Sequence, residues 1–235
     1  MQTTSRRAVL GWLGAAGAVV STRALGGCAG DAMRGRDAGG GIDGGGYHVP
    51  DGGYHVPDVD AGEACVPTRP DAQGPFFAPG APSRTNLASV DEPGQPLVIL
   101  GQVLADDCTT PIAGALLDVW QADAAGSYHD AGTDYRLRGQ LLSDAQGGYS
   151  FSTIKPGNYE TAPGAWRPAH IHFTVSAPGF APVTTQMYFA GDPYLPPNDS
   201  CTGCGSDDAA RVITLYPGEG ALIGDFRIVL RHLTP

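Results

Sequence analysis

Two histidines spaced two residues apart stand in the segment WRPAHIHF, at positions 170 and 172. On a helix such a pair would diverge, but on a strand alternate side chains point to the same face. As a strand, His170 and His172 would share one face, while Ile171, Phe173 and Val175 would share the other. The apolar face would pack into a core and leave two imidazoles side by side, an arrangement that suits a metal ion. Two ligands do not complete a metal site, so further ligands must come from elsewhere in the chain.

Two tyrosines stand where expected strands give way to loops. Tyr128 follows the strand pattern ALLDVWQA across the loop DAAGS, and Tyr159 follows the turn KPGN. Functional side chains are concentrated in such loops. A tyrosine in a sandwich is, however, more often a packing residue whose hydroxyl is hydrogen-bonded. Tyr135 and Tyr149 lie between these two and are rival candidates, of which Tyr149 fits strand packing better.

Several segments together resemble the intradiol ring-cleavage dioxygenases, above all the iron-bearing β subunit of protocatechuate 3,4-dioxygenase: DVWQADAAGSY, TIKPGNY, WRPAHIHF, TTQMYFAGDP and DFRIVLR. The resemblance runs from about residue 74 to residue 232. It implies one non-haem Fe(III) per domain, held by two tyrosinates and two histidines that match Tyr128, Tyr159, His170 and His172. These ligand types agree with the metal, because Fe(III) is a hard ion that favours anionic oxygen with imidazole beside it.

The resemblance also implies a reaction. O2 would be inserted between the two hydroxylated carbons of a catechol-type ring, of the catechol, protocatechuate or hydroxyquinol class, to give a muconate-type diacid. Tyr159 would accept a substrate proton, and Arg167 would hold positive charge against the developing anion. Gln186 matches a glutamine of the family's active site, and GPFFAPG (74–80) matches its stretch near the pocket mouth. The loop that contains Tyr135 is shorter than in the protocatechuate enzyme, which keeps that tyrosine in contention.

The remaining pattern is one of short strands punctuated by turns. Seven runs fit this description: LVILGQVLA (97–105), ALLDVWQA (115–122), YRLRGQLLS (135–143), YSFSTI (149–154), PAHIHFTVSA, PVTTQMYFA and LIGDFRIVLR. Together with 35 glycines and 20 prolines, they predict an all-β sandwich of the transthyretin or immunoglobulin-like type. Only SDDAARVI looks helical, and Trp120 is expected in the core. Since many such sandwiches catalyse nothing, the alternative function is a non-catalytic surface binding module that retains a metal site.

The chain divides into three parts. Residues 1–27 contain TSRRAVLGWLGAAGAVV, which is typical of a twin-arginine export signal, and lead into a lipobox-like LGGC that ends at Cys28. This pattern predicts lipidation of Cys28, with an ordinary cleaved signal as the alternative. Residues 28–62 are rich in Gly and Asp and predict a disordered tether, and residues 63–235 form the domain. We therefore expect an exported protein, periplasmic or anchored to the outer membrane by lipid.

Charge restricts the partners. The chain has 14 basic and 24 acidic residues, and removal of residues 1–27 would take three arginines and leave 11 basic residues. So acidic a surface argues against nucleic acid and against direct contact with an anionic membrane. The expected partners are a small aromatic diol and O2, and the sequence leaves a homo-oligomer or a partner subunit open.

Four cysteines stand in the expected domain: Cys65, Cys108, Cys201 and Cys204. In an exported protein an even number of cysteines predicts disulfides. The pair CTGC could also serve a zinc or redox site, but it lacks a second pair and a strand–helix context. We expect at least one structural disulfide, with all three pairings open.

Overall fold

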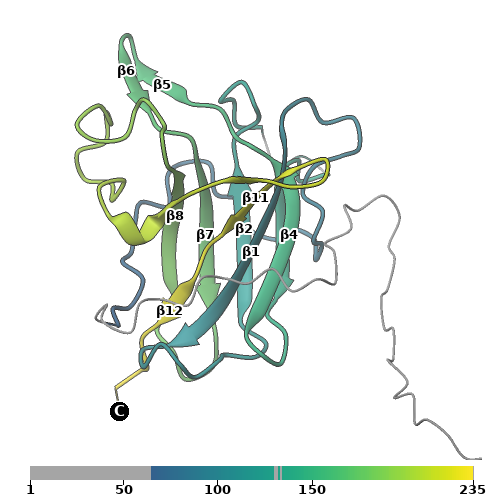
Figure 1. Cartoon of the computed structure of the whole chain (residues 1–235), viewed down its shortest axis with the longest axis vertical. Coiled ribbons are helices and arrows are strands. Elements are labelled where there is room, and N and C mark those ends of the chain that lie inside the picture. The colour runs from purple at the N-terminus through teal and green to yellow at the C-terminus, as the bar shows by residue number, and fades with distance from the viewer. Residues whose placement is uncertain (1–64, 130–131, 133, 235) are drawn as a thin grey trace, which may run out of the picture. The chain divides into compact units, whose positions relative to one another are not determined.

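A computed structural model describes residues 65–129, 132 and 134–234. These residues form a β-sandwich of two five-stranded sheets with an additional two-stranded sheet (Figure 1). The all-β prediction is therefore confirmed. The expected export signal, Cys28 and the 28–62 tether lie outside the described residues.

One sheet is built on the long strand β1. Its members are β1 (Pro96–Ala105), β4 (Gly148–Ile154), β10 (Tyr216–Pro217), β11 (Leu222–Asp225) and β12 (Ile228–Leu230). Strand β4 pairs antiparallel with β1, whereas β11 and β12 both pair parallel to it, one after the other.

The second sheet has the order β3-β2-β7-β8-β9 and carries the histidine pair. Its strands are β3 (Arg138–Leu142), β2 (Leu116–Gln121), β7 (His170–Ser176), β8 (Val183–Phe189) and β9 (Val212–Ile213). The short hairpin of β5 (Tyr159–Ala162) and β6 (Ala165–Arg167) lies beyond the end where β7 begins (Figure 1). Because β2, β7 and β8 pair side by side, residues of one face stand in rows across the three strands.

Each of the seven expected runs contains a strand, and three details differ. The last run splits into β11 and β12, because the chain leaves β1 at Phe226, whose amide still donates to the Leu100 carbonyl. The strands β5, β6, β9 and β10 were not expected, since two to four residues carry no readable period. The expected helix is a single 3-10 turn, Ala209–Arg211, which the Asp208 side chain caps.

The core fills the space between the two sheets. Ile171, Phe173 and Val175 of β7 are fully buried in it together with Ile99 and Val103 of β1, as the alternation predicts. Trp120 is also buried. No helix in the described part of the chain is long and apolar enough to cross a membrane.

Two disulfides join the four domain cysteines, which confirms the prediction of structural bonds. Cys65 pairs with Cys108 over a sequence separation of 43 residues, and Cys201 pairs with Cys204 over a separation of 3. The first ties the beginning of the domain to the turn after β1. The second closes a tight loop between β8 and the 3-10 turn.

Candidate metal centre

The histidine pair lies on the face of β7 that points away from the core. His170 and His172 are 2% and 3% exposed, so both imidazoles are buried although they are outside the hydrophobic cluster. In the row across the sheet, His172 lies between Trp120 of β2 and Gln186 of β8. His170 stands opposite Tyr188 of β8. The central strands thus hold both rings at fixed positions.

Three donor atoms converge on this face. The distance between His170 Nε2 and His172 Nε2 is 3.1 Å, and Tyr128 Oη lies 3.2 Å from the former and 3.0 Å from the latter. Tyr128 comes from the loop after β2, at the end of the sheet where β7 begins. The structure therefore brings together three of the four expected ligands, from a loop and a strand more than forty residues apart.

The proton on His170 leaves a lone pair directed at this convergence. His170 Nδ1 lies 2.7 Å from the Pro168 carbonyl, which assigns its proton to Nδ1 and leaves Nε2 as an acceptor. Burial, aided by the charge of Arg167, lowers the pKa of His170 to about 3. Burial, together with His170, also lowers the pKa of His172 well below its ordinary value. Both rings are therefore neutral near pH 7, as metal ligands must be.

Hydrogen bonds cannot satisfy this triangle of atoms. Tyr128 has one hydroxyl proton, His172 Nε2 can carry at most one, and His170 Nε2 has none, so at least one of the three contacts lacks a proton. A cation at about 2 Å from each donor would space neighbouring ligands about 3 Å apart, which matches the observed separations. Within the described residues no group of three or more His, Cys, Asp or Glu side chains could hold a metal. A metal bound by these three atoms would have to accept a tyrosine oxygen beside two imidazoles.

Tyr159, the fourth expected ligand, lies beside this group at the start of β5. Its ring centroid is 5.6 Å from that of His170 and 5.8 Å from that of Tyr128. Burial raises the pKa of Tyr159, and a hydrogen bond with Arg167 opposes the increase. Burial also raises the pKa of Tyr128, with a further contribution from Tyr159. Without a cation both phenols stay protonated; a trivalent cation would favour their ionised forms.

The two rival tyrosines use their hydroxyls elsewhere. Tyr135 Oη donates to the Pro79 carbonyl at 3.1 Å, which ties it to the segment 74–80. Tyr149 Oη donates to the Phe226 carbonyl at 2.6 Å inside the core. Neither makes a described contact with the two histidines, so the geometry favours Tyr159 over both.

Arg167 and Gln186 form a polar network next to the donor atoms. Arg167 Nη2 donates to Gln186 Oε1 at 3.0 Å and to Tyr188 Oη at 3.2 Å, and all three side chains are buried. Gln186 Nε2 donates to the Ala72 carbonyl, and Tyr188 Oη donates to Asp71. The buried Arg167 guanidinium thus faces Tyr159, and its hydrogen bonds to Gln186 and Tyr188 fix its orientation.

Aromatic rings cover the donor group on its other side. Trp120 stacks on His172 with centroids 4.7 Å apart, and Phe76 stacks on Tyr128 at 4.2 Å. Trp120 is thus buried, but on the histidine face of the sheet and outside the core cluster in which it was expected, and it supports a candidate ligand. Phe76 is 40% exposed. The segment GPFFAPG, expected near the pocket mouth, therefore does lie against the site.

Sequence reasoning missed Asp71, Tyr188 and Asp199. Asp199 Oδ1 lies 2.9 Å from Arg167 Nε, and Asp71 accepts from Tyr188 and Arg211. The two aspartates stand in loops with no periodic pattern, and the chain has many aspartates. Tyr188 carried a signal, because it is two residues from Gln186 and shares its strand face.

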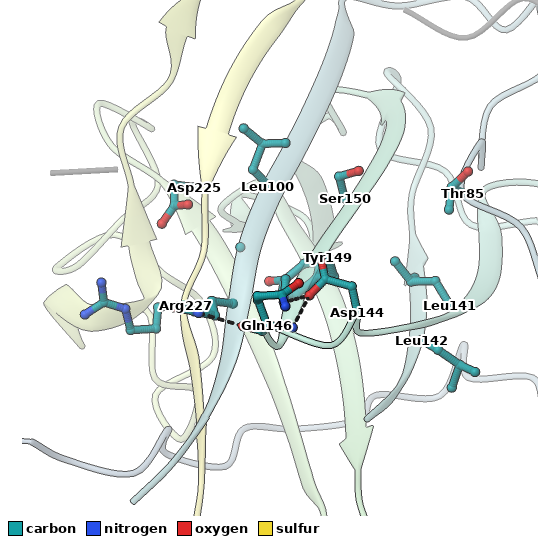
Figure 2. Close-up of a pocket in the computed structure, with 13 residues that line it drawn as sticks. Thr85, Leu100, Leu141, Leu142, Asp144, Gln146, Tyr149, Ser150, Asp225 and Arg227 are labelled. Carbon is teal, nitrogen blue, oxygen red and sulfur yellow. Dashed lines mark hydrogen bonds between the residues drawn. The ribbon is translucent and has the colours of Figure 1, made fainter. Parts of the chain in front are cut away.

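A separate cavity of about 690 Å³ lies beside β1 and β4 (Figure 2). Asp144, Asp225 and Arg227 are among its lining residues. The Asp144 carboxylate accepts from the amides of Gln146 and Gly148, so it serves the turn between β3 and β4. None of the candidate ligands lines this cavity, which is therefore distinct from the donor group.

Comparisons with known proteins agree with this geometry. A family model described as "Dioxygenase" matches residues 72–213. Chlorocatechol 1,2-dioxygenase of Rhodococcus opacus is 36% identical over 184 residues, which are 68% of this chain and 71% of that protein. The protocatechuate 3,4-dioxygenase beta chain of Burkholderia cepacia is 40% identical over 163 residues, 62% of this chain and 69% of its own length.

A solved structure shares the fold over most of the described domain. It is the dioxygenase domain of a dioxygenase carbohydrate-binding protein fusion from Streptomyces sp. SirexAA-E, with a TM-score of 0.61 and 36% identity. The match covers 72% of this chain and 100% of that one.

Proposed function

Because this chain belongs to the intradiol ring-cleavage dioxygenase family, we propose that it uses a non-haem Fe(III) to cleave a catechol-type ring with O2. The product would be a muconate-type diacid, formed by insertion of both oxygen atoms between the two hydroxylated carbons. The observation that carries the proposal is the convergence of Tyr128 Oη, His170 Nε2 and His172 Nε2 within 3.0–3.2 Å of one another.

Four side chains would hold one ferric ion per domain: Tyr128, Tyr159, His170 and His172. The set fits this ion, since two phenolates supply anionic oxygen and two neutral imidazoles complete it. When bound, the ferric ion supplies Lewis acidity and withdraws electron density from a coordinated catecholate. Zinc would be expected to select thiolate, imidazole or carboxylate ligands instead.

The neighbouring residues have roles that follow from their positions. The Tyr159 phenol makes a hydrogen bond with Arg167, and its oxygen would accept a proton from a catechol hydroxyl. Arg167, buried and oriented by Gln186 and Tyr188, would stabilise negative charge on the substrate. Trp120 and Phe76 would exclude water from one side of the ligands.

We propose a catechol-type diol as the substrate class. The relatives include enzymes named for chlorocatechol as well as one named for protocatechuate, so a specifically protocatechuate 3,4-type activity is too narrow. The stacked pair of Phe76 and Tyr128 supports a planar aromatic substrate at this mouth.

We further propose that the protein is exported and that lipid on Cys28 anchors it. The support is the paired arginines and the LGGC segment of the sequence, both outside the described residues. Membrane contact would be through this anchor alone. Mass analysis of the mature N-terminus from the native host tests the proposal, and a chain that begins elsewhere without acyl groups would refute it.

Oxygen consumption is the deciding test of the activity. Iron-loaded protein should consume O2 with catechol, and both atoms of isotopically labelled O2 should appear in the ring-opened acid. The resting protein should also be coloured, because tyrosinate–Fe(III) charge transfer absorbs visible light. A coloured protein that consumes no O2 with any catechol, protocatechuate or hydroxyquinol would instead support the alternative, a metal-bearing binding module.

A further inference from the structure

Asp199 connects the candidate active site to the Cys201–Cys204 loop. Its carboxylate Oδ1 lies 2.9 Å from Arg167 Nε, and the two side chains are 3% and 7% exposed. The same oxygen accepts from the Cys201 amide at 2.9 Å, and Oδ2 accepts from Ser206 Oγ at 2.5 Å. The buried carboxylate thus bridges the arginine and the two sides of the disulfide loop.

Arg167 is held on two sides of its guanidinium group. Gln186 and Tyr188, both on β8, accept from Nη2, while the Asp199 carboxylate lies beside Nε as an ion-pair partner whose geometry does not make a hydrogen bond. Asp199 is the acidic partner of Arg167 among the described ion pairs. Removal of one partner of a buried ion pair is strongly destabilising, because the other charge stays buried. Loss of the Asp199 carboxylate would therefore leave the Arg167 guanidinium buried without its ion-pair partner. Asp199 therefore fixes both the charge balance and the direction of this side chain.

The loop that presents Asp199 has no regular secondary structure, and its disulfide and individual hydrogen bonds hold its shape. The segment NDSCTGCGSDD is rich in Asp, Ser and Gly, a composition typical of turns and flexible loops. Its hydrogen bonds include Ser200 N to the Trp166 carbonyl, at 2.8 Å, and Cys204 N to the Cys201 carbonyl, at 3.2 Å. The disulfide between Cys201 and Cys204 closes this turn directly after Asp199.

The far end of the loop is anchored by a second buried ion pair. Gly205 N donates to Asp71 Oδ2, which also accepts from Arg211 Nη1 at 2.8 Å. A Cβ on Gly205 would overlap the Arg211 guanidinium, so the backbone packs directly on this ion pair. The loop is therefore fixed at its end, and the disulfide fixes the part that carries Asp199.

We propose that Asp199 is a positioning residue for Arg167, and that the Cys201–Cys204 disulfide acts on ring cleavage by holding Asp199 in place. The inference rests on the proposed function, in which Arg167 stabilises charge on the substrate. The role proposed for the Cys201–Cys204 disulfide differs from stabilisation of the whole fold. A bond that spans 3 residues restricts the unfolded chain less than Cys65–Cys108, which spans 43.

Asp199→Asn is the first test, because it keeps the size and removes the charge. For the iron-loaded full chain we expect kcat to fall about tenfold to a hundredfold, with a much smaller change in KM, as a slightly misplaced catalytic group produces. Asp207→Asn, an exposed aspartate of the same loop, is the matched control and should leave kcat unchanged.

The two disulfides provide a second matched pair. Cys201→Ser with Cys204→Ser should lower kcat as Asp199→Asn does and lower the melting temperature little. Cys65→Ser with Cys108→Ser should lower the melting temperature and leave kcat unchanged. If the first double variant does not fold, Asp199→Asn still decides the question, because it keeps the disulfide.

A readout without iron separates this inference from the proposed function. In the metal-free full chain, labelled with 15N on arginine, the Nε–H signal of Arg167 can be assigned by its loss in Arg167→Lys. Because the Asp199 carboxylate lies 2.9 Å from Nε, we expect this signal to shift in Asp199→Asn and in the Cys201/Cys204 variant but not in Asp207→Asn. An unchanged Arg167 signal in both variants would overturn the inference, as would unchanged kcat. If the unaltered protein cleaves no catechol, the proposed function fails, while the Arg167 signal still tests the positioning by Asp199.

Discussion

At the scale of single residues, the proposed metal centre rests on Tyr128, His170 and His172. Their donor atoms lie within 3.0–3.2 Å of one another although too few protons are available for three hydrogen bonds. Buried polar atoms are normally paired, and an unpaired contact among them is costly. A shared cation is the arrangement that satisfies all three atoms at once.

Phenylalanine substitutions test the two tyrosines. Tyr128→Phe and Tyr159→Phe keep the ring and delete the oxygen, so a packing tyrosine would lose about 0.5–1.5 kcal/mol for one hydrogen bond. We expect instead that each variant folds and that its visible charge-transfer band shifts or weakens. Loss of Tyr128 should disturb the resting iron more, while loss of Tyr159 should mainly slow substrate binding and deprotonation. Absorption spectra at known iron content and stopped-flow binding of catechol measure the difference.

Tyr135→Phe is the control for this pair. Its hydroxyl donates to the Pro79 carbonyl rather than toward the histidines, so the spectrum should stay as in the unaltered protein. If Tyr135→Phe bleaches the colour and Tyr159→Phe does not, the assignment of the second phenolate is wrong.

The residues of the site differ in how far sequence could find them. His170 and His172 were readable because a strand has a period of two, so their spacing alone puts them on one face. Tyr128 and Tyr159 needed the order of several motifs. Asp199 could not be found, since it contacts Arg167 across 32 positions of chain from a loop without a pattern. Contacts of that kind depend on the folded loop.

Two loops, 123–128 after β2 and 155–159 after β4, bring the tyrosines together at the scale of elements. Gly157 N donates to the Asp123 carbonyl at 2.9 Å, and a Cβ on Gly157 would lie 2.4 Å from the Ala124 carbonyl oxygen. A Cβ on Gly126 would lie 2.1 Å from the Asn158 carbonyl oxygen. The backbones are therefore in direct contact, and glycine is required where they touch.

Gly126→Ala should separate these loops. Its φ is 80°, and Gly164 in the β5–β6 turn has a φ of 79°, but a Cβ on Gly164 would meet open space within 4 Å. Both alanine variants should lose about 1–2 kcal/mol for the left-handed backbone. Gly126→Ala should lose more and should also weaken the visible band, because Tyr128 and Tyr159 move apart. Urea unfolding and absorption spectra compare the two variants, and equal effects would contradict this account.

The strands themselves were the most predictable part of the fold. Long runs such as Pro96–Ala105 alternate or stay apolar over a full strand, so their type follows from local pattern. The break between β11 and β12 could not be predicted, because it depends on how the chain passes along β1. Short strands such as β5 and β6 form through their partners rather than through their own composition.

At the scale of the whole molecule, the beginning of the domain is tied to both the sandwich and the polar network near the candidate site. The Cys65–Cys108 bond ties it to the turn after β1, and the Thr68 amide donates to the Val229 carbonyl of β12. The segment then places Asp71 in a buried position against Tyr188 and Arg211. A segment without a strand pattern thus completes the polar network behind the candidate site.

The stability of the metal-free protein should depend on pH through the buried histidines. The pKa of His170 is about 3 when folded, against about 6.5 for an unperturbed histidine. Between these values the unfolded chain binds a proton that the folded chain does not. The contribution of neutral His170 to the free energy of unfolding is therefore fully present above about pH 6.5. It falls as pH decreases toward 3, by up to about 1.4 kcal/mol per pH unit.

His170→Gln tests this contribution, because glutamine does not titrate. We expect the free energy of unfolding of the metal-free protein to fall less steeply between pH 6.5 and pH 4.5 in the variant than in the unaltered chain. His172, whose pKa is also lowered by burial, should leave the variant with a remaining slope of the same sign. Urea titrations at a series of pH values give both slopes. Equal slopes would show that His170 takes up its proton in the folded state as readily as in the unfolded chain, and would remove the argument that its lone pair is held free for a cation.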